Sequence, residues 1–233
     1  MNAQQLQVYA AASLTDAFAD LETAFETAHP GSDISLTFAG SQVLRLQIEH
    51  GAAADVFASA NAHHMQALVA AGRIDRSDVF AHNELVVIVP SDNPAGIETI
   101  DDLVRAQRFV IGSQHVPIGV YAHKVIDQIG HQRGRDVQAT IESHIVSEES
   151  NVRLIRAKVE LGEADAALVY RTDAVSSAGV RTIAIPAAFN VRAQYPIGIV
   201  ADSKKPALAK AWLAFLGSAE GQKILTKHGF SSP

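Results

Sequence analysis

Short apolar stretches alternate with stretches of helical periodicity along the chain, and this alternation constrains the fold more than any other feature. The first apolar stretch runs from Leu6 to Ala10, and apolar residues then recur at helical spacing from Leu14 to Phe25. Residues 34–38 alternate between apolar and polar, which is the period of a half-buried strand. Strands that alternate with helices of about 10 to 15 residues are typical of parallel βαβ units, so the sequence predicts an α/β fold.

The later expected elements continue this order. Strands are expected at 55–58, 85–89, 108–111, 140–147, 166–170, 181–185 and 197–200. Helices are expected after Gly40, at 65–72, 118–129, 152–162, 206–217 and 218–227. The run Leu85–Val89 is unbroken and Pro90 follows it, so we expect a strand that is buried on both faces.

Composition excludes several classes of function. The chain has 233 residues, of which 48% are hydrophobic and 19% charged, as in a folded protein with its own core. The formal net charge is −6 and no basic cluster occurs, so nucleic acid is not expected as a partner. The chain has 0 cysteines, which excludes disulfides and thiolate chemistry. No apolar run is long enough to cross a bilayer, and Met1-Asn2-Ala3-Gln4-Gln5 lacks the features of an export signal.

Three strand-to-helix turns carry small or hydroxyl residues where a helix is expected to begin. They are Ala10-Ala11-Ala12-Ser13, Phe38-Ala39-Gly40-Ser41 and Glu149-Ser150-Asn151-Val152. The first backbone N–H groups of a helix are free and its dipole is positive there, so an anion can bind without a charged side chain. N-capping is the commoner role of serine, and Ser13 with Asp16 has the spacing of a capping box. Three such turns nevertheless favour an anion site, because ligands gather at the carboxyl ends of parallel strands.

Sequence motifs for nucleotide binding or covalent chemistry are missing. The sequence contains no G-x-x-x-x-G-K-[ST], no G-x-G-x-x-G, no G-x-S-x-G and no H-E-x-x-H. The 10 histidines are scattered, and no group of acidic residues has the spacing of a metal site. Tyr170 ends the expected strand 166–170, where its hydroxyl either points into a cleft or packs inside the fold. The residues alone leave both interpretations of Tyr170 open.

Several longer stretches form a pattern that spans nearly the whole chain. They are V-Y-A-A-A-S-L-T-D-A-F at 8–18, F-A-G-S-Q-V-L-R-L-Q-I-E-H-G-A-A-A-D-V-F-A-S-A at 38–60, H-V-P-I-G-V-Y-A at 115–122, S-N-V-R at 150–153, A-L-V-Y at 167–170, Y-P-I-G at 195–198 and G-F at 229–230. Each stretch is modest alone, and together they are specific. The pattern resembles the molybdate-binding proteins of ABC transporters, a family similar to the type II periplasmic binding proteins.

This resemblance implies a two-lobe fold. Each lobe would hold a mostly parallel sheet flanked by helices, and the ligand would lie in the cleft. Lobe one would be discontinuous and comprise residues 1–89 and 196–233, while lobe two would comprise residues 90–195. The chain would cross between the lobes near 89–94 and near 190–196.

The resemblance also implies which groups bind the ligand. Ser13 and Ser41 of lobe one would donate through their hydroxyl and backbone N–H groups. Lobe two would contribute the backbone N–H groups of Ile118 and Val152 and the hydroxyl of Tyr170. The resemblance implies no catalytic residue and no direct protein ligand to a metal, since molybdenum would be bound as its oxyanion.

The sequence departs from the family pattern at three positions. Ile118 stands where many relatives have alanine, which keeps a backbone donor but gives the pocket wall a larger side chain. Ala53 stands in a turn where proline is common. Gly40 stands where serine is also seen, so one hydroxyl is absent.

The function implied by the resemblance is that of an extracytoplasmic solute-binding protein and not of an enzyme. The protein would capture molybdate, and tungstate as well, and deliver it to the membrane permease of an ABC transporter. We expect a periplasmic monomer without a cofactor, whose export signal has been removed. Neutral donors at helix termini suit a dianion that carries no proton at neutral pH.

Three alternatives to this function stay open. The first is a binding protein for another tetrahedral oxyanion, such as sulfate or phosphate. The second is an enzyme that acts on a phosphorylated small molecule, which the lack of an identifiable nucleophile or base disfavours. The third is a ligand-sensing regulator, which the lack of a helix-turn-helix extension disfavours.

Overall fold

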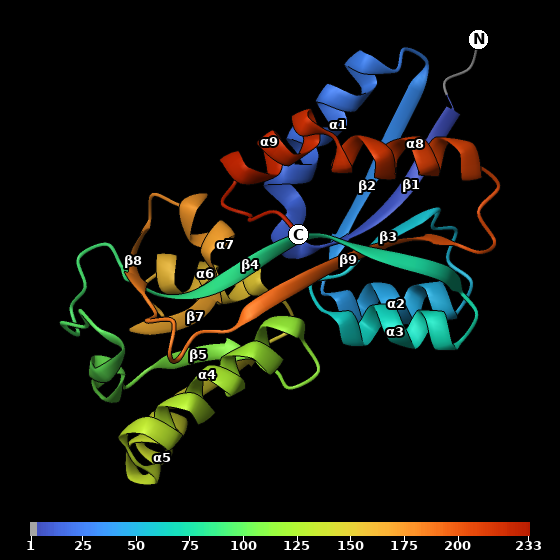
Figure 1. The fold of residues 1–233 in the computed structure, drawn as a ribbon. Helices are drawn as coiled ribbons and strands as arrows, with labels where there is room; N and C mark the ends of the chain where they lie inside the picture. The colour runs from blue at the N-terminus through green and yellow to red at the C-terminus, as the bar shows by residue number, and fades with distance from the viewer. Residues whose placement is uncertain (1–3) are drawn as a thin grey trace. The chain divides into compact units, whose positions relative to one another are not determined.

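The chain forms two compact units (Figure 1). The computed structural model describes residues 4–233. Met1, Asn2 and Ala3, which begin the stretch that was inspected above for an export signal, lie outside the described residues. Unit 1 comprises the chain up to His82 together with Gln194–Pro233, and unit 2 comprises Asn83–Ala193. Two strands run through both units, namely β4 (Ile74–Pro90) and β9 (Arg192–Val200).

The boundaries of the units differ from those expected from the sequence. The first boundary falls after His82 and not after residue 89, and the second falls before Gln194 and not before residue 196. The buried run Leu85–Val89 belongs to unit 2, because it pairs antiparallel with β7 (Ala166–Tyr170) and β8 (Val180–Ala184). Since β4 continues without a break over 17 residues, its apolar pattern does not reveal where the strand leaves unit 1.

The sheet of unit 1 has the strand order β2-β1-β3-β9, and the first part of β4 lies next to β9. Its N-terminal strands are β1 (Gln4–Ala11), β2 (Ser32–Ala39) and β3 (Val56–Ala58). β1 pairs parallel with both β2 and β3, whereas β3 pairs antiparallel with β9. Parallel pairing of β1 with both neighbours places the carboxyl ends of these three strands at one edge of the sheet.

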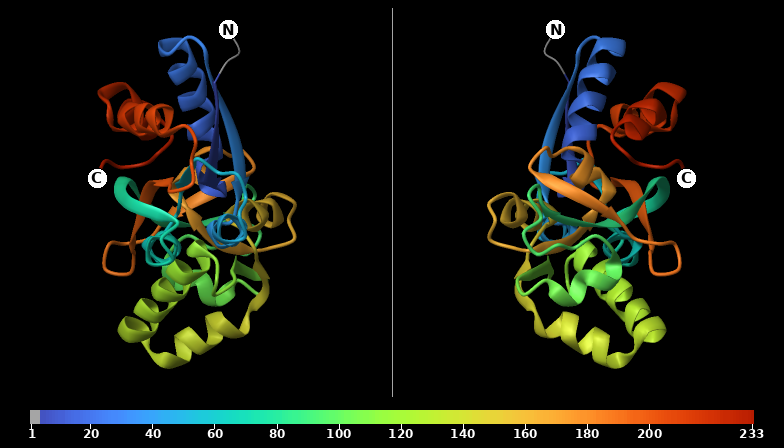
Figure 2. Two further views of the ribbon diagram at one scale, coloured as in Figure 1. Left: turned by 90° about the vertical axis from the view of Figure 1, so that its right-hand side faces the viewer. Right: turned by 90° about the vertical axis from the view of Figure 1, so that its left-hand side faces the viewer.

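Two groups of helices cover the sheet of unit 1. The first group contains α1 (Thr15–Ala28), α8 (Pro206–Gly217) and α9 (Ala219–Lys227), which pack side by side (Figure 2). Trp212 of α8 is fully buried there, with its ring centroid 5.8 Å from that of Phe18 and 5.3 Å from that of Phe25. The second group contains α2 (Ser41–Glu49) and α3 (Ala62–Ala70), which pack together around a separate buried cluster.

Unit 2 has a sheet of order β8-β4-β7-β5-β6. β5 (Phe109–Gly112) pairs parallel with both β6 (Ile145–Glu149) and β7. The helices of this unit are α4 (Pro117–Arg133), α5 (Arg135–Ser143), α6 (Val152–Glu160) and α7 (Arg171–Val175), with the 3-10 helix η2 at Ile100–Arg105. The α/β class is confirmed, although both sheets are mixed because β4 and β9 run antiparallel to their partners.

The prediction of a strand at 140–147 is wrong over its first half. Residues up to Ser143 belong to α5, and only Ile145–Glu149 forms β6. The Thr140 hydroxyl donates to the backbone carbonyl of Asp136 at 2.9 Å, as threonine does within a helix. The β-branched residues of this stretch favour a strand, but burial of Ile141 on one helix face outweighs that local preference.

Among the helices of residues 4–233, none combines the length and the apolar character that a membrane crossing requires.

Candidate functional site

In unit 1 the register of β1 and β2 brings the two candidate serines to one edge of the sheet. The last residues of these parallel strands, Ala11 and Ala39, are direct partners. Ser13 lies just beyond β1 in the 3-10 helix η1 (Ala12–Leu14), and Ser41 lies just beyond β2 as the first residue of α2. The two side chains are buried, with 5% and 1% of their residues' surface exposed. Strand pairing thus places two buried hydroxyl groups at the carboxyl edge.

Ser13 does not cap a helix. α1 begins at Thr15, and its N-cap is Leu14, which makes no side-chain cap hydrogen bond. The capping box predicted for Ser13 and Asp16 is therefore wrong. The Ser13 hydroxyl instead lies 2.9 Å from the hydroxyl of Tyr195 in β9, in a buried pair of side chains.

Ser41 is held by the backbone of the neighbouring strand-to-helix turn. Its hydroxyl oxygen accepts a hydrogen bond from the backbone N–H of Ala60 at 3.1 Å. Gly40 precedes it as the N-cap of α2 and offers no side-chain hydrogen bond. A serine oxygen that accepts one hydrogen bond keeps its own proton for donation. Ser41 therefore suits a ligand that accepts hydrogen bonds.

The third strand of this edge was predicted at 55–58, but the buried polar residues that follow it, and the tyrosine that faces Ser13, were not. Ser59 and Asn61 follow β3, whose Ala58 is level with Ala10 of β1, and both side chains are buried. Asn61 caps α3 by accepting a hydrogen bond from the backbone N–H of His64 at 3.1 Å. The signal available in the sequence was a run of polar residues directly after a short apolar strand.

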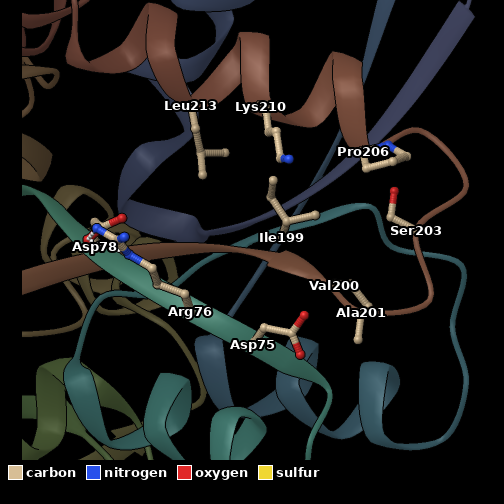
Figure 3. A pocket seen from close by; sticks show the side chains of 10 residues that line it. All are labelled: Asp75, Arg76, Asp78, Ile199, Val200, Ala201, Ser203, Pro206, Lys210 and Leu213. Carbon is tan, nitrogen blue, oxygen red and sulfur yellow. Dashed lines mark hydrogen bonds and ion pairs between the residues drawn. The ribbon is translucent and has the colours of Figure 1, made fainter.

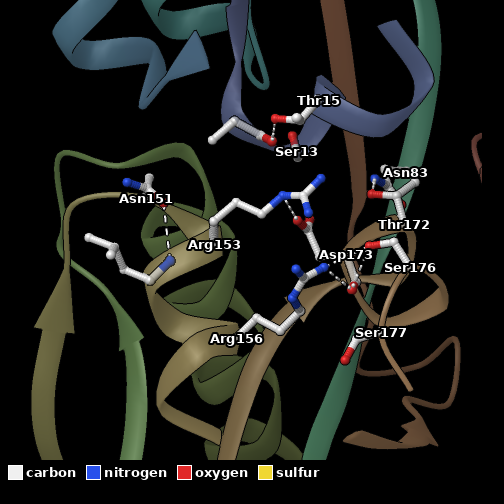
Figure 4. A network of polar contacts seen from close by, with 12 residues as sticks. Ser13, Thr15, Asn83, Asn151, Arg153, Arg156, Thr172, Asp173, Ser176 and Ser177 are labelled. Atoms are coloured by element: carbon white, nitrogen blue, oxygen red, sulfur yellow. Dashed lines mark hydrogen bonds and ion pairs between the residues drawn. The ribbon is translucent and has the colours of Figure 1, made fainter. Parts of the chain in front are cut away.

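In unit 2 the starts of α4 and α6 lie at the carboxyl edge of β5 and β6, whose ends are paired in parallel. Pro117 opens α4 and has no N–H, so Ile118 supplies the first backbone donor of that helix. Val152 is the first residue of α6, and its N-cap Asn151 accepts from the backbone N–H of Leu154 at 3.2 Å (Figure 4). Because Asn151 satisfies a later N–H group, the N–H of Val152 keeps its capacity to donate.

A close backbone approach fixes the first turn of α4. A Cβ atom on Gly119 would lie 2.0 Å from the carbonyl oxygen of Ser113 and 2.3 Å from that of Gly112. No side chain fits at such distances, so only glycine allows the helix start to lie against the end of β5. Gly119 thereby determines where the N–H group of Ile118 lies.

Tyr170 is the last residue of β7 and the N-cap of α7, a short helix that the sequence analysis did not predict. Its side chain is buried, and its ring lies 6.3 Å from the ring of Tyr121 in an edge-to-face arrangement. Since β7 and β5 are parallel, Tyr170 ends its strand at the same sheet edge as the starts of α4 and α6. All five residues of the predicted ligand site, including Ile118 and Val152, are at least nine-tenths buried.

Two acidic side chains at this edge of unit 2, Asp173 and Glu149, have basic partners. The Arg153 Nε atom lies 3.4 Å from Oδ1 of Asp173, whose carboxylate is fully buried (Figure 4). Lys158 lies 2.7 Å from the carboxylate of Glu149. Burial raises the pKa of the Glu149 carboxyl, but hydrogen bonds from Lys158 and Ser147 outweigh burial and bring this pKa below its usual value. The edge thus holds carboxylates whose charge is balanced locally.

A large hollow in unit 1 lies at the other end of the sheet. It has a volume of about 590 Å³ and is lined by residues of β4, β9 and α8 (Figure 3). Ile199 in its wall pairs with Val56, the first residue of β3, whereas Ser41 contacts the turn that follows β3. Its charged residues include Asp75 and Lys210, so both signs of charge line it. This hollow therefore does not contribute to the hydroxyl edge.

Comparison with known proteins assigns the family. The chain matches the model for the bacterial extracellular solute-binding proteins over residues 6–231. The chain belongs to this family. It is 36% identical over 234 residues to the molybdate-binding protein ModA of Mycobacterium bovis, a match that covers 99% of this chain and 86% of the relative. The resemblance noted in the sequence is confirmed.

Solved structures of solute-binding proteins share the fold of this chain. The periplasmic molybdate-binding protein of Azotobacter vinelandii aligns with a TM-score of 0.84 and 19% identity, covering 98% of this chain and 99% of that one. The sulfate-binding protein SubI of Mycobacterium tuberculosis aligns with a TM-score of 0.88 and 19% identity, covering 98% and 87%. At this identity the likeness shows the fold alone, so the two structures do not choose between the two oxyanions.

The chemistry of both edges agrees with membership of a solute-binding family. The groups that we find there are hydroxyl and backbone N–H donors, which bind an acceptor ligand without forming a covalent bond. Within residues 4–233, no three histidine or acidic side chains cluster so that they could hold a metal ion.

Proposed function

We propose that this solute-binding protein binds molybdate, and tungstate as well, and delivers the oxyanion to the permease of an ABC transporter. The observation that carries this proposal is the burial of the candidate donors within each unit, namely Ser13 and Ser41 in unit 1 and Ile118, Val152 and Tyr170 in unit 2. The likeness to ModA of Mycobacterium bovis supports molybdate as the ligand. In this proposal the protein acts as a periplasmic monomer, without a cofactor and without catalysis.

The donor set suits a tetrahedral oxyanion that carries no proton. Molybdate offers only acceptor oxygens at neutral pH, and the proposed site offers hydroxyl and N–H donors. The starts of α2, α4 and α6 add positive dipole ends, which offset negative charge without a charged side chain. A ligand that carries an O–H group would need an acceptor in the site, so a donor-rich site disfavours protonated phosphate.

Sulfate is the second candidate, because the sulfate-binding protein SubI shares the fold of this chain and the donor chemistry suits both oxyanions. Sulfate has the same charge and shape as molybdate and is also unprotonated at neutral pH. Donor type therefore does not separate the two, and the size of the site must do so. We prefer molybdate because ModA matches this chain at 36% identity, well above the 19% of the sulfate-binding structure.

Calorimetric titration of the purified protein tests the proposal. Molybdate, tungstate, sulfate and inorganic phosphate are titrated in parallel at neutral pH. We expect molybdate and tungstate to bind one per chain and more tightly than sulfate, with phosphate weakest. Sulfate binding as tight as molybdate binding would contradict the molybdate assignment, and tight phosphate binding would contradict the donor-only site.

A further inference from the structure

The packing of Tyr195 directs its hydroxyl to Ser13. The Tyr195 side chain is fully buried in β9, and its ring meets those of Phe230 and Phe80 edge to face, at centroid distances of 5.2 Å and 6.5 Å. These contacts fix the ring, so the hydroxyl is delivered 2.9 Å from the Ser13 hydroxyl. Sequence analysis gave this tyrosine no role.

The direction of the hydrogen bond between the two hydroxyls decides what Ser13 can do. Either oxygen can donate. A phenol is more acidic than an aliphatic alcohol, which makes Tyr195 the better donor. When Tyr195 donates, the proton of Ser13 is left to point elsewhere, and hydrogen bonds arranged in a chain strengthen one another. An anion beside Ser13 favours this direction further.

We propose that Tyr195 is a positioning residue that makes Ser13 a donor and thereby helps the site to select unprotonated oxyanions. This inference rests on the proposed function. Tyr195 donates to the Ser13 oxygen, and Ser13 donates to the ligand. Ser13 then presents its proton to the ligand, and the O–H group of hydrogenphosphate meets a donor where it would need an acceptor.

The partners of Ser41 and Ser13 differ, and this difference makes Ser13 the better position for a test by substitution. The Ser41 oxygen accepts its hydrogen bond from the backbone of Ala60, which no side-chain substitution removes. The Ser13 oxygen depends on a side chain, so its hydrogen-bond direction can be changed by one substitution. At Ser13 two substitutions separate two effects. Tyr195→Phe changes the direction in which the Ser13 hydroxyl donates, and Ser13→Ala removes the hydroxyl itself.

The experiment is a double-mutant cycle with Tyr195→Phe and Ser13→Ala, in which each variant is titrated with molybdate and with inorganic phosphate. We expect Tyr195→Phe to weaken molybdate binding about tenfold. We expect phosphate binding to stay unchanged or to tighten, so the preference for molybdate falls by at least this factor. In the Ser13→Ala background, Tyr195→Phe should change molybdate affinity less than about twofold, because its effect passes through Ser13.

Tyr9→Phe is the matched control, since Tyr9 is a partly buried tyrosine of the same unit, in β1. It should leave both affinities unchanged. If Tyr195→Phe does not fold, 3-fluorotyrosine at position 195 replaces it, because fluorine keeps the hydroxyl and makes it a stronger donor. Molybdate affinity should then equal or exceed that of the parent protein, and a weaker affinity would overturn the inference.

The outcomes separate this inference from the proposed function. A parent protein that does not bind molybdate refutes the proposed function, and this inference with it. A parent that binds molybdate, with effects of the two substitutions that simply add, overturns the inference alone. The same holds if Tyr195→Phe lowers the unfolding midpoint while the molybdate-to-phosphate preference is unchanged.

Discussion

The two units present different kinds of donor at their sheet edges. Unit 1 offers the side-chain hydroxyls of Ser13 and Ser41, each supported by a further hydrogen bond. In the proposed site, unit 2 would offer the backbone N–H groups of Ile118 and Val152, with Tyr170 as its side-chain donor. A hydroxyl disappears with one substitution, whereas a backbone N–H survives almost any substitution and responds only when its helix moves. A backbone donor at Ile118 would therefore tolerate the large side chain of that residue.

The two edges also differ in whether charged side chains lie at them. The hydroxyls of unit 1 are supported by neutral groups, namely Tyr195 and the backbone of Ala60. Unit 2 holds the buried carboxylate of Asp173 and balances it with Arg153. An unbalanced carboxylate beside a dianion would oppose binding, so this ion pair keeps the unit 2 edge compatible with its proposed ligand.

Gly119→Ala should have the largest effect, because it moves a backbone donor instead of deleting a side chain. The added Cβ would meet the carbonyl oxygen of Ser113 at 2.0 Å, so the first turn of α4 must shift. Losing the Ile118 donor and misplacing the helix dipole should weaken molybdate binding at least about 100-fold. Gly217→Ala is the control, since nothing lies within 4 Å of a Cβ atom there. Calorimetry that finds full affinity in Gly119→Ala would show that the start of α4 does not bind the ligand.

Tyr170→Phe tests whether unit 2 binds molybdate through a side-chain hydroxyl. The ring and its contact with Tyr121 are kept, and only the hydroxyl is lost. A hydrogen bond to a charged acceptor is worth about 1.5–3 kcal/mol, so molybdate affinity should fall about 10- to 100-fold. If titration finds unchanged affinity while the unfolding midpoint drops, Tyr170 is a packing residue and unit 2 binds through its backbone alone.

Ser41→Ala should affect both binding and stability. It removes one donor and also leaves the N–H group of Ala60 without its serine acceptor. We expect molybdate affinity to fall about tenfold and the free energy of unfolding to fall by about 1–3 kcal/mol. Titration and urea unfolding measure the two quantities. Ser143→Ala, at the exposed end of α5, is the control and should change neither affinity nor stability by a comparable amount.

Ionic strength should have the smallest effect. Both edges use buried neutral donors and helix dipoles, and buried interactions are screened weakly by salt. Molybdate affinity should therefore change less than about threefold between low and physiological salt. A steep loss of affinity in titrations over this range would reveal an exposed cationic contribution and weaken the distinction drawn between the two edges.

The parts of the molecule that local pattern determines could be predicted from the sequence. The strand that leads to Ser13 and the helix that begins at Ser41 follow from hydrophobic periodicity, as does the buried run Leu85–Val89. The partner of Ser13 could not be predicted, because Tyr195 lies 182 residues away and only tertiary packing brings the two together. The spacing of Ser13 and Asp16 favoured a capping role for Ser13, but in the folded protein its hydroxyl pairs with the hydroxyl of Tyr195.

At residues 140–147, local pattern predicted the wrong element. Thr140 and Ile141 are residues that favour strands in isolation. Burial of one face of α5 decides their conformation instead, and that burial depends on the rest of unit 2. The ion pair between Arg153 and Asp173 was equally invisible, because α7 is too short to leave a periodic signal.

The chain leaves unit 1 at His82 and returns to it at Gln194, and this path orders the events of folding. Trp212 packs against Phe18 in the core of unit 1, so that core stays open until synthesis has passed residue 212. Unit 2 is one uninterrupted segment and can finish its own contacts earlier. Tyr195 is synthesised after all of unit 2, so the hydroxyl pair with Ser13 is among the last features to form. A chain interrupted during synthesis would therefore possess the backbone donors of unit 2 long before it possessed a finished hydroxyl edge.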